Sequence, residues 1–136
     1  MMDPPERKGN GMPRPLVSLI LPLLPYLAAG TCAAADIAAG QAEFNKCKIC
    51  HTLESGGRNM VGPNLLGVFG RKAGTGDKFL YSEAMKASGI VWDDQTLAKY
   101  LRSPREAVPN GKMAFPGIKN DDQIANLLAY LHQATQ

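Results

Sequence analysis

Two long stretches of this chain, residues 52–77 and 103–119, show no sustained hydrophobic period and are interrupted by glycine and proline. Connections longer than about 15 residues without secondary structure of their own are uncommon in small domains. With 136 residues, the chain allows one domain and hardly two. We therefore expect the two stretches to wrap around something other than the polypeptide itself.

The first 35 residues have the pattern of a signal peptide. Arg7, Lys8 and Arg14 precede an apolar run over residues 16–29, and three alanines at 33–35 offer a cleavage site. We expect a signal peptide at 1–35, a folded domain at 36–136, and export to the bacterial periplasm. Cys32 would leave with the signal peptide, because the residues before it match a lipoprotein cleavage site poorly.

Alternatives remain for this segment. The apolar run has 14 residues and two prolines, whereas a membrane-spanning helix needs about 20 apolar residues, which disfavours an anchor. Counting on to Ala35 gives 20 residues without a charge, so a retained tether to the inner membrane stays an alternative. Met12 is an alternative start of translation.

Composition narrows the classes of function. The chain is 45% hydrophobic and 20% charged, as folded globular proteins are. Its formal charge of +3, without a basic stripe that carries aromatic residues, does not fit a nucleic-acid partner. Residues 36–136 carry twelve Lys and Arg against ten Asp and Glu, or +2. A 101-residue domain buries less than about 70% of its unfolded surface, so its core is marginal by itself.

The chain has helical signals and no convincing strand alternation. Predicted helices cover roughly residues 36–46, 81–88, 94–102 and the stretch after 120. Asp36 caps the first, Asp93 or Asp94 the third, and Asn120 with Gln123 has capping-box spacing before the last. Gly89 ends the second helix and Pro104 prevents the third from continuing. The predicted apolar faces are Gly40, Phe44 and Cys47; Leu97, Tyr100 and Leu101; and Ile124, Leu127, Leu128 and Leu131. The class is all-α, with about four helices and long loops.

Residues Cys47-Lys48-Ile49-Cys50-His51 form a Cys-X-X-Cys-His motif, the attachment pattern of c-type haem. Cysteines three residues apart lie on one side of a helical turn and can form thioethers with both vinyl groups of one porphyrin. The adjacent histidine then reaches the iron from one axial side. A redox dithiol would need a strand-to-helix context, and a zinc site would need two further Cys or His ligands. We expect one covalently bound haem c per chain.

Four side chains could fill the second axial position: Met60, Met85, Met113 and His132. His132 has the setting of an exposed residue on the last helix, and Met85 that of a core methionine. Met60 follows the motif by nine residues, a reach of at most about 30 Å, so distance does not exclude it. Met113 lies in a proline-rich irregular segment that could press a thioether onto a flat cofactor, and this context favours it.

Residues 37–135 resemble class I cytochrome c, in the soluble bacterial group that is most similar to the mitochondrial protein. The matching stretches run in order through the domain: 44–51, 62–65, 67–71, 79–82, 92, 100–104, 111–115 and 129–131. The resemblance implies a single small fold that wraps the haem, with crossed N- and C-terminal helices. Gly40 and Phe44 would pack on Leu127 and Tyr130 at that crossing.

The resemblance also implies roles for individual residues. Cys47 and Cys50 would carry the haem, and His51 and Met113 would bind the iron. Pro63 would accept a hydrogen bond from His51.

Further roles concern the surroundings of the haem. The resemblance implies that Arg71, Tyr81 and Trp92 surround the inner haem propionate and that Tyr100 lies near the methionine sulfur. Met85 departs from the family pattern, because the mitochondrial relatives have an asparagine near the haem there.

The function implied is that of an electron carrier rather than an enzyme. Its partners would present acidic faces, as on a cytochrome bc complex, a terminal oxidase, a photosynthetic reaction centre or a periplasmic dehydrogenase. We expect a monomer with a cationic rim of Lys46, Arg105, Lys112 and Lys119. The alternatives are a ligand-binding or peroxidase-like haem protein with an open sixth site, a membrane-tethered cytochrome c, and a haem subunit fixed within one complex.

Overall fold

The computed structural model describes residues 2, 3, 5, 9 and 34–136. Nearly all of the predicted signal peptide, with Cys32 and the alternative start Met12, lies outside these residues. None of the helices in the described part is both long and apolar enough to cross a membrane.

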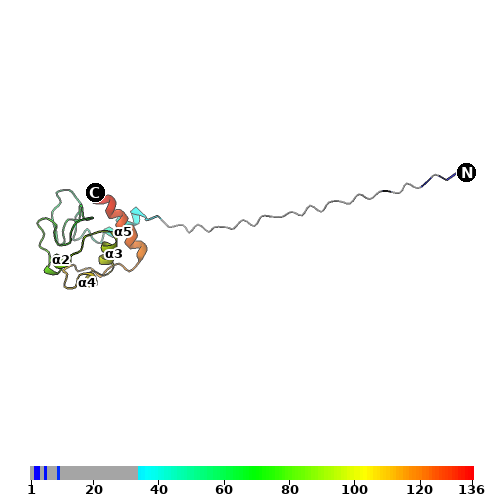
Figure 1. The fold of residues 1–136 in the computed structure, drawn as a ribbon. Coiled ribbons are helices and arrows are strands. Elements are labelled where there is room, and N and C mark those ends of the chain that lie inside the picture. Colours follow the sequence, from blue (N-terminus) through cyan, green and yellow to red (C-terminus); the bar gives the residue numbers. More distant parts are fainter. Residues whose placement is uncertain (1, 4, 6–8, 10–33) are drawn as a thin grey trace. The chain divides into compact units, whose positions relative to one another are not determined.

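The folded part contains helices separated by long loops (Figure 1). The helices are α1 (Ile37–Phe44), α2 (Glu83–Ala87), α3 (Asp94–Arg102), α4 (Pro104–Ala107) and α5 (Asp121–Ala134). Residues 34–136 contain no strand, only an isolated antiparallel bridge between Lys72 and Val91. The predicted all-α class is confirmed.

Most predicted caps are present. Asp36 accepts hydrogen bonds from the amides of Ala38 and Ala39, and Asp93 forms a capping box with Thr96. Such caps stabilise a helix by about 1 kcal/mol each.

The cap of α5 differs in one respect from the prediction. Asn120 accepts from the Gln123 amide, but the Gln123 side chain donates to Glu43 at 2.9 Å instead of closing a capping box. The side chain therefore links α5 to α1, which a spacing rule within one helix cannot anticipate.

Helix α4 was not predicted, because Pro104 was interpreted only as the end of α3. Proline suits the first turn of a helix, where its missing N–H needs no partner. The chain turns at Ser103 and starts a new four-residue helix with Pro104 in its first turn. The proline that stops one helix thus begins the next.

The terminal helices cross, as predicted, and α1 lies against α5 in Figure 1. A Cβ on Gly40 would stand 2.0 Å from the Asn126 carbonyl oxygen, so only glycine permits this approach. The Phe44 and Tyr130 rings pack at 5.6 Å. Leu127, beneath the crossing, is 0% exposed, and truncating such a side chain costs about 2–5 kcal/mol.

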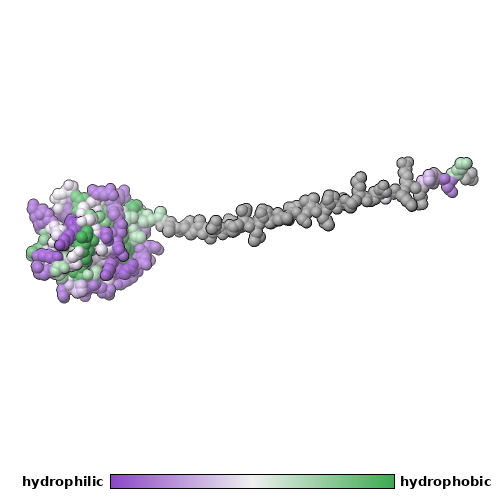
Figure 2. Space-filling model, viewed as in Figure 1, coloured by the Kyte–Doolittle hydropathy of each residue, from purple (hydrophilic) through white to green (hydrophobic). Residues whose placement is uncertain are grey.

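The predicted apolar faces form the core. Every one of their residues is buried except Cys47, which is half-buried and packs against the core. The face drawn in Figure 2 has hydrophobic side chains gathered in its middle, surrounded by hydrophilic ones. Large hydrophobic residues that remain exposed on the folded part are Ile37, Ile49, Met60, Val61, Leu80 and Val91.

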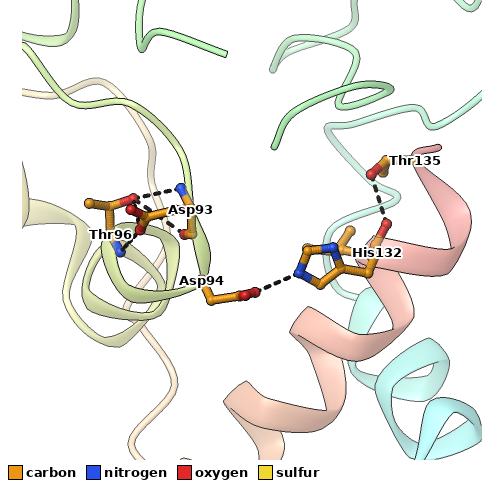
Figure 3. Close-up of polar contacts among 6 residues, drawn as sticks. Asp93, Asp94, Thr96, His132 and Thr135 are labelled. Carbon is orange, nitrogen blue, oxygen red and sulfur yellow. Dashed lines mark hydrogen bonds and ion pairs between the residues drawn. The ribbon is translucent and has the colours of Figure 1, made fainter. Parts of the chain in front are cut away.

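A polar contact joins the start of α3 to the end of α5 (Figure 3). The Asp94 carboxylate lies 2.6 Å from Nε2 of His132, and the His132 ring stacks on Phe69 at 3.7 Å between centroids. The Thr135 carbonyl accepts from the Gly67 amide at 2.8 Å. His132 is therefore a half-buried tether between helices rather than a freely exposed residue.

Candidate haem site

The Cys-X-X-Cys-His motif forms a turn that continues directly from α1. The amides of Cys50 and His51 both donate to the Cys47 carbonyl, at 3.0 and 2.9 Å. Cys47 and Cys50 therefore lie one turn apart, as thioether formation with one porphyrin requires. Both are half-buried and neither is in a disulfide.

The Cys47 thiol lacks the lowered pKa that is typical of a redox-active cysteine. Burial, with a smaller contribution from Glu43, raises its pKa above the ordinary value. Redox-active cysteines have a lowered pKa instead.

The His51 ring is held by residues 62 and 63. Its Nδ1 lies 2.8 Å from the Pro63 carbonyl oxygen, which can only accept, so Nδ1 carries the proton. The Gly62 amide donates to the Cys50 carbonyl at 2.8 Å. A Cβ on Gly62 would come within 2.3–2.7 Å of the His51 ring atoms, so glycine leaves the space that the imidazole fills.

This arrangement leaves one nitrogen of His51 for a metal. Burial lowers the pKa of His51, and the hydrogen bond to Pro63 opposes this in part. The imidazole is therefore neutral, with Nδ1 as a donor and Nε2 as an acceptor. Histidine ligands are commonly oriented through a hydrogen bond from the second ring nitrogen.

Asn64 organises the loop that follows, a role that the sequence reasoning missed. Its side-chain amide donates to the carbonyls of Glu54 and Gly57, and its side-chain oxygen accepts from Leu66, at 2.7–3.0 Å. An asparagine directly after Gly-Pro is a signal for such turns. The Gly62 contact with His51 had no comparable sequence signal, because it joins residues eleven apart.

The residues predicted around a propionate come together. The backbones of Arg71 and Trp92 are hydrogen-bonded at 3.0 Å, and the Trp92 ring packs on Tyr100 at 5.1 Å. Burial raises the pKa of Tyr81, while the nearby Arg71 charge lowers it in part. Arg71 donates to the carbonyls of Leu66 and Asn64, both at 3.2 Å.

The methionines differ in their surroundings. Met113 is half-buried and packs against the core. Met85 is buried in α2, 9% exposed, and Met60 is 40% exposed.

The residues present fit a covalently attached haem. A turn presents two free cysteines, a neutral histidine keeps Nε2 available, and half-buried apolar side chains, Cys47 among them, pack against the core. The two irregular stretches predicted to wrap a cofactor contribute Leu53, Leu65, Phe69, Met113 and Phe115 to that border.

Comparisons with known proteins agree with this geometry. Residues 37–135 match the family model described as cytochrome c. The chain is 48% identical over 96 residues to cytochrome c-550 of Bradyrhizobium diazoefficiens, covering 71% of each chain. It is 49% identical over 98 residues to cytochrome c2 of Rhodoplanes tepidamans, covering 72% of this chain and 92% of the relative.

A solved structure, cytochrome cH from Methylobacterium extorquens, is similar with a TM-score of 0.68 and 44% identity, over 72% of this chain and 98% of that one. Sequence, fold and site thus agree on the same family of electron carriers. The chain belongs to the cytochrome c family, as a class I mono-haem c-type cytochrome with a covalently bound haem c.

Proposed function

We propose that this protein shuttles single electrons between redox complexes, with His51 and Met113 as the axial ligands of its haem iron. The observation that carries the proposal is the fixed, neutral His51, whose Nδ1–H is donated to Pro63. When bound, the haem supplies an iron that is stable in the ferrous and the ferric state. The protein then needs to rearrange little as an electron arrives or leaves.

The surroundings of the other candidates support Met113 as the second ligand. His132 is engaged by Asp94 and stacked on Phe69. Met85 lies in the core and Met60 is 40% exposed. Met113 is the remaining candidate that borders the core from an irregular loop.

The chain's own residues set the redox properties. A thioether ligand and apolar surroundings favour ferrous iron and raise the reduction potential. The hydrogen bond to Pro63 makes His51 a stronger donor and acts in the opposite direction. We expect a positive potential.

Polar groups would hold the haem propionate. Arg71 uses two of its five N–H donors on the loop carbonyls. The remaining donors, with Tyr81 and Trp92, can compensate a partly buried carboxylate, while Tyr100 packs on Trp92.

The docking surface would be small and only weakly cationic. Lys46 is paired with Glu43 at 2.7 Å, and Lys119 donates to the Arg102 carbonyl. Arg105 and Lys112 form no ion pair within the described part of the chain. In the part of the chain that the structure describes, the rim expected from the sequence therefore keeps three cations without an ion-pair partner, Arg105, Lys112 and Lys119, while Glu43 compensates Lys46.

Such a surface suits brief, charge-steered contact with acidic faces. We propose as partners a cytochrome bc complex with a terminal oxidase, a photosynthetic reaction centre or a periplasmic dehydrogenase. Charge reversal at Arg105 or Lys112 should slow association at low ionic strength, with little effect at high salt.

We also propose that residues 1–35 are a cleaved signal peptide and that 36–136 work as a monomer in the periplasm. Mass spectrometry of the native protein tests this. A mass that begins near Asp36 supports it, and a retained N-terminus favours the membrane-tethered alternative.

The ligand assignment is tested with Met113→Ala and, as a matched control, Met60→Ala. Met113→Ala should lower the reduction potential by on the order of 100 mV and allow cyanide and carbon monoxide to bind. Met60→Ala should change neither property. An unchanged potential in Met113→Ala would exclude this ligand, and rapid cyanide binding by the unmodified protein would favour a ligand-binding haem protein.

A further inference from the structure

The stretch 112–117, which carries Met113, makes no hydrogen bond through its backbone to any residue that the structure describes. The nearest bonds lie outside it: Gly111 donates to Val108 at 3.0 Å, and Ile118 donates to Leu101 at 2.9 Å. Met113 and Phe115 pack on the core from within the stretch. Its position is therefore set by side-chain packing and by how its two ends are attached.

The second end of the stretch docks on the last turn of α3. A helix leaves its last four carbonyls without partners of its own. The Leu101 carbonyl accepts from the Ile118 amide, and the Arg102 carbonyl accepts from Nζ of Lys119 at 3.1 Å. A cation at the C-terminal end of a helix is also favoured by the helix dipole.

Gly117 allows this docking. Its φ of +94° lies in the left-handed region, and a Cβ would stand 2.2 Å from the Arg102 carbonyl oxygen. Any other residue would push the end of the methionine stretch away from α3.

An ion pair extends the contact to α5. The Arg102 guanidinium donates to the carboxylate of Asp121, which lies in the first turn of α5. A carboxylate at that position is favoured by the dipole of α5. Arg102 thus joins the end of the stretch and the start of the last helix.

We propose that Arg102, Gly117, Lys119 and Asp121 form a clasp that positions the methionine stretch and so keeps Met113 on the haem iron. The effect of the clasp on Met113 ligation rests on the proposed function, whereas its effect on the position of residues 112–117 does not. These residues act as positioning residues, through the end of the stretch that carries Met113.

The main test compares Gly117→Ala with Gly89→Ala in the haem-loaded ferric protein. Both glycines have positive φ, but a Cβ on Gly89 meets nothing within 4 Å, so this control carries only the backbone strain. Gly117→Ala should speed cyanide binding and amide exchange at Ile118, whose N–H is bonded to the Leu101 carbonyl, by about tenfold, since both report the population of the detached stretch. Gly89→Ala should leave both rates within about twofold of the parent.

A milder series covers the case in which Gly117→Ala does not fold. Lys119→Gln should raise both rates by about threefold. Lys119→Arg should keep both rates near those of the parent, because arginine can also donate to the Arg102 carbonyl. Lys72→Gln is the control, since the Lys72 side chain makes no hydrogen bond or ion pair in the described part of the chain. Equal rates in Lys119→Gln and Lys72→Gln would overturn the clasp.

The two proposals fail in different ways. If Met113→Ala leaves cyanide binding unchanged, the ligand assignment is wrong, and amide exchange alone decides the clasp. If Met113→Ala opens the iron while Gly117→Ala behaves like Gly89→Ala in both assays, the ligand assignment holds and the clasp is wrong.

Discussion

The loops that present the two proposed ligands are held in opposite ways. On the histidine side, residues 52–66 hydrogen-bond densely to one another, through Asn64 above all, and Pro63 bonds His51 directly. On the methionine side, residues 112–117 lack backbone hydrogen bonds to the described chain and are attached at their ends. The comparison indicates that His51 is fixed locally, whereas the position of Met113 depends on side-chain packing and on the attachment of the two ends of its stretch.

The largest effect should come from removing the haem, which we expect both loops to surround. Cys47→Ala with Cys50→Ala prevents haem attachment, and we expect the 36–136 domain to be largely unfolded, because the two irregular stretches lose the cofactor that they are expected to surround and a core of this size is marginal by itself. Circular dichroism and thermal melting measure this. A helical apo form with a cooperative melting transition would contradict it.

Gly62→Ala should destabilise only the loop that holds His51. Because its Cβ would overlap the His51 ring, we expect a loss of at least about 3 kcal/mol in unfolding free energy, or failure to mature. Gly56→Ala in the same loop is the control, since its Cβ meets nothing within 4 Å. It should cost only about 1 kcal/mol for its positive φ, and equal losses in denaturant titration would refute the assignment.

Asn64→Ala should loosen the same loop without touching the histidine. Removing one side chain leaves three backbone groups without their partner, so we expect a loss of about 2–3 kcal/mol. Asn45→Ala, an exposed residue at the end of α1, should change stability by less than about 0.5 kcal/mol. Chemical denaturation of the holoprotein distinguishes the two.

Tyr100 tests the packing of α3 against Trp92 through its pH dependence. Burial raises the pKa of Tyr100 to about 12, so the folded state favours the neutral phenol. Its contribution to stability is present in full below the ordinary tyrosine pKa of 10.0 and is lost as pH rises from there toward 12. Tyr100→Phe should remove that alkaline loss, on the order of 1–3 kcal/mol. Identical stability curves for parent and variant between pH 9 and 12 would argue against it.

The smallest effect is expected outside both loops. His132 and Asp94 are each partly exposed, and such ion pairs contribute about 0.2–1 kcal/mol. A double-mutant cycle with His132→Gln and Asp94→Asn measures their coupling. A coupling above about 2 kcal/mol would show that the tether between α3 and α5 is more than a surface pair.

The sequence predicted the helices well where periodicity and caps agree, as in α3 and α5. It missed α4 because a proline ends one helix and starts another within two residues. The sequence gives no sign of the contacts of His132, because its partners, Asp94 and Phe69, lie 38 and 63 positions away. Pairings at such separations carry no local periodic signal.

The sequence by itself determined the chemistry: two cysteines and a histidine in five consecutive residues, two irregular stretches, and helices with apolar faces. Only the tertiary structure decided which ring nitrogen of His51 carries the proton, which glycine makes room for the His51 ring, and how the end of the methionine stretch meets α3. The physical reason is range. Helix capping and thioether geometry act over three to five residues, whereas a carbonyl that accepts from a residue 17 positions away exists only once the whole chain has folded.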